Sequence, residues 1–260
     1  MCTVTWLQSG DGYQLHCNRD ERHTRLLAAD PLTQSRHGAR FIAPLDGNHG
    51  GSWITVNQFK ITLCLLNRYV SANSSRDDEK MYRSRGLLLL DLVDSRSLAE
   101  VRDRINTIRL EGFQPFTLIG LEPGTLAVLL DWTGRNLLHQ SNSESALPLV
   151  SSSFDQRGVE ISRRRLFDRM MGERGQTDSE LLHAFHASHL PHRGAYSPCM
   201  HRADASTVSH SLVKVAGDRI EFSYFPGAPC EQAETVQGRR KEKSLQTLIL
   251  STVDELITTQ

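Results

Sequence analysis

The sequence lacks the features that mark a membrane protein, a nucleotide-binding protein or a secreted precursor. No apolar run comes near the length of about 20 residues that crosses a bilayer. The densest run, residues 87–93, is interrupted by Asp91. Neither GxxxxGKS/T nor GxGxxG, the glycine motifs that hold phosphate groups, occurs. The first residues have no basic start and no apolar core, so they do not resemble a signal peptide. We therefore expect a cytoplasmic protein without stable membrane insertion.

Net charge and paired cysteines are missing as well. Thirty Lys and Arg residues balance thirty Asp and Glu residues, so no overall field attracts nucleic acid. The five cysteines are odd in number, widely spread and without CxxC spacing. This pattern argues against a disulfide framework and against a zinc site built from paired cysteines. We expect no metal site and mostly buried, reduced thiols.

What is present suits one large domain of mixed α and β structure. The chain has 260 residues, of which 38% are hydrophobic, and that is enough for a single sizeable core. Strand-like residues 3–7 and 13–17 flank Gly10-Asp11-Gly12, which predicts a hairpin. Residues 21–48 are polar and predict a loop. Further strands are expected at 52–56, 61–66, 116–121, 126–132, 136–139, 208–215 and 219–225, and helices at 84–94, 98–111, 159–172, 178–189 and 243–257.

Cys2 is the residue with the most chemical content. Removal of Met1 would make it amino-terminal, and its α-amine, with a reference pKa of about 7.7–8.0, would be a base near working pH. The thiol is a good nucleophile even when it is only partly ionised. One residue could thus supply both the nucleophile and the base of an acyl-transfer reaction.

The predicted hairpin returns Asn18, Arg19, Asp20 and Glu21 toward residue 2. A carboxylate there can hold the ammonium group, and an arginine can fix a carboxylate or bind an anionic part of a substrate. Asparagine side chains offer N–H donors for an oxyanion. Taken alone, four polar residues after a strand are more often a solvated turn, so the interpretation depends on their combination with Cys2.

The segment MCTVTW at residues 1–6, followed by NRDE at residues 18–21, resembles the NRDE family, also called the transport-and-Golgi-organization family. The resemblance extends over residues 1–231. Its further segments are GGSWITVN (50–57), LLN (65–67), SRG (84–86), PFTL (115–118), PLVSSSFD (148–155), CMHRADASTVS (199–209) and PGAPC (226–230). It implies a single domain over 1–231 and a C-terminal extension over 232–260.

The family is in turn similar to the cysteine N-terminal nucleophile hydrolases, such as bile-salt and penicillin V acylases. This implies an α+β fold, a four-layer αββα sandwich with Cys2 between the sheets. It implies catalytic roles for Cys2, Arg19, Asp20 and Asn67, the last as an oxyanion donor, and for Arg202 as a late arginine. The second oxyanion asparagine has two candidates, Asn142 and Ser152.

Two functions remain open on this basis. The first is a cysteine hydrolase of a C–N amide bond with Cys2 as nucleophile, no required cofactor, and Asn18, Glu21, Ser152 and His201 as substrate-binding residues. The second is a non-enzymatic protein that binds haem, or acyl-CoA and other lipids, in the same pocket, which the resemblance implies through roles in haem trafficking and lipid metabolism. The partner in either case is a small molecule, not nucleic acid.

Three other signals have plainer interpretations. His183, His186 and His189 recur on one broad helix face, where a metal or haem site is conceivable but ordinary core histidines are more common. The run 163–165 of three arginines is typical of a solvated helix face. The predicted C-terminal helix is typical of a docking helix, and it could also pair subunits into a homo-oligomer.

Overall fold

Two antiparallel sheets form the centre of the computed structural model, which describes residues 2–69, 81–140, 146–174, 178–232 and 244–252. The six-stranded sheet has the order β10-β1-β2-β11-β12-β13, and the seven-stranded sheet runs from β3 to β9 in sequence order. The strands are β1 (Cys2–Ser9), β2 (Gly12–Arg22), β3 (Ala29–Arg36), β4 (Ala39–Leu45), β5 (Ile54–Asn57), β6 (Thr62–Asn67), β7 (Phe116–Leu121), β8 (Val128–Trp132), β9 (Leu137–Gln140), β10 (Leu149–Ser151), β11 (Ala205–Ala216), β12 (Arg219–Phe225) and β13 (Gln246–Ser251).

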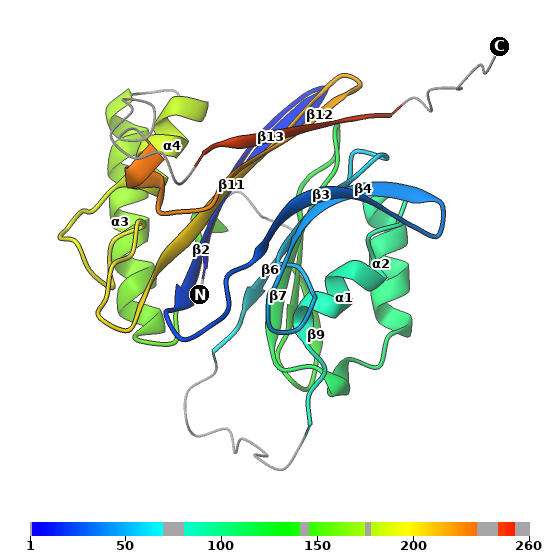
Figure 1. Cartoon of the computed structure of the whole chain (residues 1–260), viewed down its shortest axis with the longest axis horizontal. Helices are drawn as coiled ribbons and strands as arrows, with labels where there is room; N and C mark the ends of the chain where they lie inside the picture. The colour runs from blue at the N-terminus through cyan, green and yellow to red at the C-terminus, as the bar shows by residue number, and fades with distance from the viewer. Residues whose placement is uncertain (1, 70–80, 141–145, 175–177, 233–243, 253–260) are drawn as a thin grey trace.

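Helices cover the outer face of each sheet, and this confirms the predicted αββα sandwich. They are α1 (Arg85–Asp91), α2 (Leu98–Thr107), α3 (Gln156–Arg174) and α4 (Ser179–Ala187), with short 3-10 turns η1 (Leu110–Gly112) and η3 (Pro229–Glu231). Figure 1 shows α3 and α4 on one side of the two sheets and α1 and α2 on the other. None of the helices in the described part of the chain is long and apolar enough to cross a membrane.

The buried apolar side chains fall into layers that match this arrangement. The largest cluster, which includes Val4, Trp6 and Ile54, fills the space between the inner faces of the two sheets. A second cluster joins the seven-stranded sheet to α1 and α2, and a smaller one lies between α3 and α4. Alternate residues of each strand therefore face opposite layers, so a side chain's position along its strand decides whether it reaches the space between the sheets.

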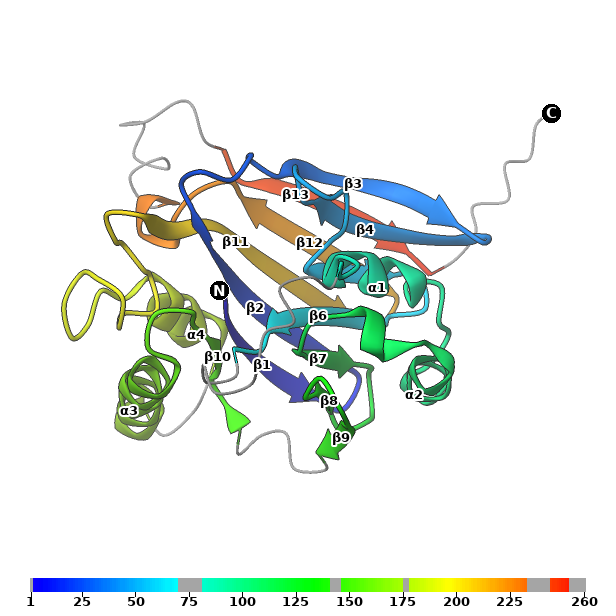
Figure 2. The same cartoon turned by 90° about the horizontal axis from the view of Figure 1, so that it is seen from below.

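The first hairpin forms as its sequence predicts. β1 pairs with β2 in the register Cys2 opposite Arg19 and Thr3 opposite Asn18. On its other edge β1 pairs with the short strand β10, where Ser151 is opposite Cys2. Figure 2, viewed from below, shows β1 lying between β2 and β10 at the N-terminal end of the chain. Cys2 is therefore held by two neighbouring strands.

The prediction of a loop over 21–48 was wrong, because this segment contains β3 and β4. β4 is an inner strand with Phe41 and Ile42 buried. β3 is the edge of its sheet, and most of its residues are exposed or partly so. A strand at the edge of a sheet can pair with its one neighbour without an apolar face. The sequence of β3 is therefore as polar as that of a loop.

The prediction of a C-terminal helix over 243–257 was also wrong for the described residues 244–252. β13 adds to the edge of the six-stranded sheet, with Leu250 opposite Ile220 and Leu248 opposite Phe222. Leu250 is buried whereas Ile249 is exposed, which is the alternation of a strand. Leu248 and Ile249 are adjacent and both apolar, although only one of them faces the core. In the sequence this pair resembles the apolar spacing of a helix.

Four histidines are packed between the six-stranded sheet and α4. His183 and His186 extend from α4 toward His16 on β2 and His210 on β11, and the rings of His16, His186 and His210 lie 5.4–5.6 Å apart. Burial, together with the neighbouring rings, holds the pKa of His16 and of His186 well below the usual value. Burial likewise lowers the pKa of His210 to about 3. These are neutral core histidines, and His189 lies beyond α4, away from them.

Acidification should destabilise the fold through this cluster of histidines. The folded pKa values lie below the unfolded value of about 6.5, so stability is complete above that pH and falls below it. For His210 alone the loss at pH 5 is on the order of 2 kcal/mol. Urea unfolding at pH 7.5 and pH 5 measures this difference. It should shrink in His210→Gln and persist in His192→Gln, an exposed control. Equal stability of the wild type at the two pH values would contradict this account.

Candidate active site

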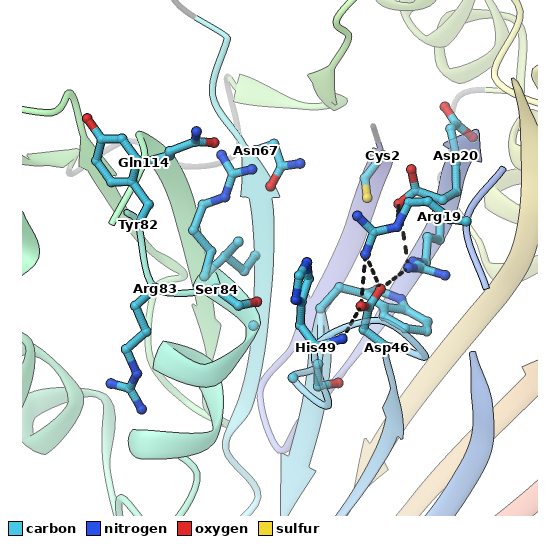
Figure 3. A pocket seen from close by; sticks show the side chains of 18 residues that line it. Cys2, Arg19, Asp20, Asp46, His49, Asn67, Tyr82, Arg83, Ser84 and Gln114 are labelled. Atoms are coloured by element: carbon cyan, nitrogen blue, oxygen red, sulfur yellow. Dashed lines mark hydrogen bonds and ion pairs between the residues drawn. The ribbon is translucent and has the colours of Figure 1, made fainter. Parts of the chain in front are cut away.

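A cavity of about 320 Å³ opens between the two sheets at the end where β1 begins. Its wall includes residues from β1, β2 and β6, from the loop before β5 and from the start of α1. Figure 3 shows Cys2 and Asp20 on one side of this cavity and Asn67 across from them. The side chains used below are Cys2, Arg19, Asp20, Glu21, Arg25, Asp46, Asn67 and Arg85, which all line it.

Cys2 is 7% exposed and belongs both to the cavity wall and to the core between the sheets. A hydrogen bond with the Cys17 thiol and burial raise the pKa of the Cys2 thiol well above its usual value. Because a thiol is a weaker nucleophile than a thiolate, Cys2 needs a base close by to remove its proton before it can attack a carbonyl group.

Asp20 is fully buried behind Cys2 in a network of polar groups. Its Oδ1 accepts a hydrogen bond from Oγ1 of Thr207 at 2.7 Å, and its Oδ2 lies 3.4 Å from Nη1 of Arg163. The same arginine donates to Oγ1 of Thr3 and, at 3.2 Å, to the backbone carbonyl of Ala195. Because Arg19 is the register partner of Cys2, Asp20 lies beside the amino end of β1. A carboxylate fixed there is placed to hold a positively charged amine.

Arg19 belongs to a second, separate cluster of charges. Its Nη2 lies 2.5 Å from Oδ2 of Asp46 and 3.5 Å from Oε2 of Glu21, and its guanidinium stacks 4.2 Å above the ring of Trp53. Arg25 contacts the same two carboxylates. Burial by itself raises the pKa of Asp46, but the two guanidinium groups lower it below the usual value. The cluster keeps Arg19 rigid at the cavity wall.

The opposite wall carries Asn67 and Arg85. The side-chain amide of Asn67 donates to the hydroxyl of Tyr69 at 3.3 Å, which leaves its second N–H hydrogen for another acceptor. Burial lowers the pKa of Arg85 from its usual value. Its Nη1 donates to the carbonyl of Pro115 at 2.9 Å. No carboxylate of the described residues forms an ion pair with it. Within the described part of the chain, the positive charge of Arg85 is therefore not neutralised by a carboxylate and is available to bind an anion.

Two glycines bring this wall into place. A Cβ atom on Gly51 would come within 2.5 Å of the backbone carbon of Gly86, and one on Gly86 within 2.8 Å of the backbone nitrogen of Ser52. The backbone of Ser52 also donates to Gly86 at 3.1 Å. The two chain segments can approach this closely only without side chains, and the contact sets the start of α1, where Arg85 lies.

The family model described as Transport and Golgi organisation 2 matches residues 1–189. The chain belongs to this family. No curated protein matches the sequence.

Solved structures similar to this member of the Transport and Golgi organisation 2 family include N-terminal nucleophile hydrolases. The Caenorhabditis elegans ortholog of N-acylethanolamine-hydrolyzing acid amidase matches with a TM-score of 0.59 and 16% identity, over 96% of this chain and 100% of that chain. A variant of conjugated bile acid hydrolase from Clostridium perfringens matches with a TM-score of 0.52 and 11% identity, over 96% of this chain and 97% of that chain. Likeness at these identities shows the shared fold.

Five of the site residues expected from the sequence line this cavity: Cys2, Arg19, Asp20, Glu21 and Asn67. The others lie elsewhere. Asn18 donates to the carbonyls of His186 and Pro198 behind the six-stranded sheet. Arg202 pairs with Asp204 and stacks over the ring of Phe154. Ser152 lies in the turn before α3, where its backbone N–H donates to Gln156, and His201 contacts Cys199. Asn142 falls outside the described residues.

The sequence analysis missed Arg163, Arg85 and Asp46. Arg163 was expected on a solvated face, and that was wrong, because its side chain is 1% exposed and reaches Asp20. Its neighbour Arg165 is exposed, as the pattern predicted. A run of three arginines on a helix cannot all face one way, since successive residues are about 100° apart around the axis. This helical periodicity was the only feature of the sequence that indicated a buried arginine in the run.

Replacing Arg163 with methionine should destabilise the protein by about 3 kcal/mol or more, because it removes the charged partner of a buried carboxylate. Arg165→Met is the matched control and should stay within about 0.5 kcal/mol of the wild type. Urea denaturation measured by circular dichroism gives both values. Equal losses in the two variants would show that the Arg163–Asp20 pair does not support the fold.

Proposed function

We propose that this protein is a cysteine hydrolase of the N-terminal nucleophile type that cleaves an amide bond in a substrate with an anionic group. The observation that carries the proposal is the position of Cys2 at the first residue of β1, in the wall of the cavity and opposite Asn67. The shared fold supports it but does not decide the activity.

The base in this proposal is the α-amine of Cys2, which becomes free when Met1 is removed. Because the pKa of the Cys2 thiol is raised, the thiol cannot act without a base. An α-amine titrates at about 7.7–8.0 in model peptides, so it is partly neutral at working pH and can take the thiol proton. Asp20 then holds the resulting ammonium group, and Arg163 and Thr207 keep that carboxylate in place.

The reaction balances as an acyl transfer followed by hydrolysis. The Cys2 sulfur forms a bond to the substrate carbonyl carbon. The negatively charged oxygen of the intermediate accepts a hydrogen bond from the available N–H of Asn67. The C–N bond then breaks, and the ammonium group of Cys2 returns the proton to the leaving amine. Water, deprotonated by the same amine, then attacks the thioester carbon and the C–S bond breaks. A carboxylic acid is released, and the ammonium group returns the proton to the Cys2 sulfur.

Positive charge in the cavity supports an anionic substrate. Arg85 lies in the wall without an acidic partner among the described residues, and burial makes its charge costly. A carboxylate, sulfonate or phosphate on the substrate would compensate this charge through charge-assisted hydrogen bonds. Arg19 and Arg25 already share Asp46 and Glu21, so Arg85 is the stronger candidate for this contact.

The positive charge in the cavity also fits a second candidate function, which is binding without cleavage. A protein that binds haem or acyl-CoA without cleaving it would also present cationic side chains to propionate or phosphate groups. The two functions differ in their need for Cys2 as a nucleophile. Binding alone through Arg85 would survive the loss of the thiol, and amide cleavage would not.

Substitution of Cys2 by alanine should abolish amide hydrolysis, because Cys2 carries the only thiol among the described residues that line the cavity, and the acyl intermediate of this proposal forms on that thiol. The assay uses a panel of long-chain acyl and bile-acyl amides of glycine, taurine and ethanolamine, with the released amine quantified by mass spectrometry. Cys64→Ala, which removes another buried thiol, should remain active. Cleavage by Cys2→Ala at the wild-type rate, or no cleavage of any amide by the wild type, would contradict the proposal.

Arg85→Met should weaken the preference for anionic amides by about tenfold or more, since a hydrogen bond to a charged group contributes about 1.5–3 kcal/mol. The ratio of kcat/KM for a glycine amide to that for the ethanolamine amide of the same acyl group measures this preference. Arg83→Met is the control, because Arg83 is paired with Asp91. A ratio unchanged in Arg85→Met would assign the anion to another part of the cavity.

A further inference from the structure

A long irregular segment joins α4 to β11, and none of its residues is among those that line the cavity with Cys2. Residues 188–204 run without helix or strand apart from an isolated bridge between His201 and Ser206. Cys199 and Met200 within it are nevertheless buried. Compact irregular segments of this length are uncommon unless something other than regular backbone pairing holds them.

Four side chains meet at one point of this segment. His189 follows α4, Cys199 and His201 lie toward the end of the segment, and Cys230 comes from η3 after β12. Each residue offers one ligand atom, and the four atoms all lie within 4.8 Å of one another. Figure 1 shows the short orange turn that contains η3 next to α4. Residues from three separate parts of the chain therefore converge.

The distances within this group suit a tetrahedral ion. Nε2 of His201 lies 3.4 Å from Sγ of Cys199 and 3.6 Å from Sγ of Cys230. With Zn–S bonds of about 2.3 Å and Zn–N bonds of about 2.05 Å, tetrahedral geometry places sulfur and nitrogen about 3.5 Å apart. The two measured separations agree with this value, so the ligand atoms already lie near the corners of a zinc tetrahedron.

His189 adds an independent observation. Its Nε2 is buried and has no hydrogen-bond partner among the described residues, while its ring lies 5.1 Å from that of His201, edge to face. A buried nitrogen without a partner costs free energy. A metal ion between the four residues would supply the missing partner.

We propose that His189, Cys199, His201 and Cys230 form a structural zinc site. Two thiolates and two imidazoles are a ligand set typical of Zn²⁺, whereas Mg²⁺ and Ca²⁺ require oxygen ligands. Four protein ligands complete the tetrahedron and leave no open position for a reacting water molecule. The site therefore stabilises the segment and takes no part in the reaction proposed for Cys2.

Metal binding has one local consequence at His201. Its Nδ1 lies 3.3 Å from Nη2 of Arg193. With zinc on Nε2, the ring proton is on Nδ1, and a guanidinium group can only donate hydrogen bonds. Arg193 must then turn away, and its exposed position leaves room for this.

The zinc site would also support the active-site cavity through the polar groups behind Cys2. The backbone of Met200 donates to Oγ1 of Thr207, and this hydroxyl donates to Asp20. The carbonyl of Ala195, in the same segment, accepts from Arg163. A segment fixed at Cys199 and His201 therefore fixes the groups that hold Asp20.

The expectation of no metal site followed from the absence of CxxC spacing. The four residues are separated by ten, two and twenty-nine positions along the chain, which matches no paired-cysteine zinc motif. The set becomes visible only when the fold brings η3 to the end of α4.

The first test measures metal in the wild-type full-length chain. After dialysis against buffer without chelator, elemental analysis should find about one zinc ion per chain, as expected for a single four-ligand site. After removal of zinc by a chelator, added Co²⁺ should give the visible absorption of a tetrahedral thiolate complex. That absorption distinguishes the site from His16, His183 and His210, whose nitrogen atoms also lie within 4.8 Å of one another. Absence of both zinc and the Co²⁺ signal would overturn the proposal.

The second test locates the site. Cys199→Ala and Cys230→Ala should lose the bound zinc and the Co²⁺ absorption, whereas Cys64→Ala should keep both. Thermal unfolding of the wild type with and without chelator gives a readout that does not depend on whether the variants fold, and the chelator should lower Tm. Retention of zinc by both variants, or a disulfide between Cys199 and Cys230 in the protein purified with reductant, would contradict the assignment.

Discussion

In the β1–β2 hairpin, Cys2 lies directly opposite Arg19, and the rest of the site depends on this register. A shift of β2 by one residue would turn Arg19 toward the helices and Asn18 toward the cavity, because successive side chains of a strand face opposite sides. The register is held by buried residues on both faces, with Val4 and Trp6 between the sheets. The same packing that forms the core therefore also places the thiol in the cavity.

On the other face of the hairpin, the buried charges link the site to the helical layer. Asp20 meets Arg163 from α3 and Thr207 from β11. The irregular segment 188–204 contributes the carbonyl of Ala195 and the backbone of Met200. A buried carboxylate is costly unless it is paired and hydrogen-bonded, and the helical layer and this segment supply the partners that Asp20 needs. The proposed zinc site would act at the same junction.

The parts of this account that sequence could predict are those with local signals. The hairpin follows from two alternating runs around Gly10-Asp11-Gly12, and the helices α1 to α4 follow from apolar spacing. The edge strands β3 and β13 were missed, because β3 is polar and β13 places Leu248 and Ile249 side by side. At the site, the family resemblance pointed to Cys2 on β1, Asp20 on β2 and Asn67 at the end of β6, and the structure brings all three to one cavity. Helical periodicity indicates that the three arginines of 163–165 do not all face one way, but it does not say that Arg163 is the buried one. The burial of Arg163 and the convergence of Cys199 with Cys230 depend on contacts between distant segments.

The central claim is that Cys2 is an amino-terminal nucleophile. The most direct measurement is the intact mass and amino-terminal sequence of the purified chain, before and after treatment with a cysteine-reactive acylating probe, with the modified residue located by peptide mapping. The account predicts that Met1 is absent and that a single adduct forms on Cys2. Retention of Met1 together with an unlabelled Cys2 would contradict it.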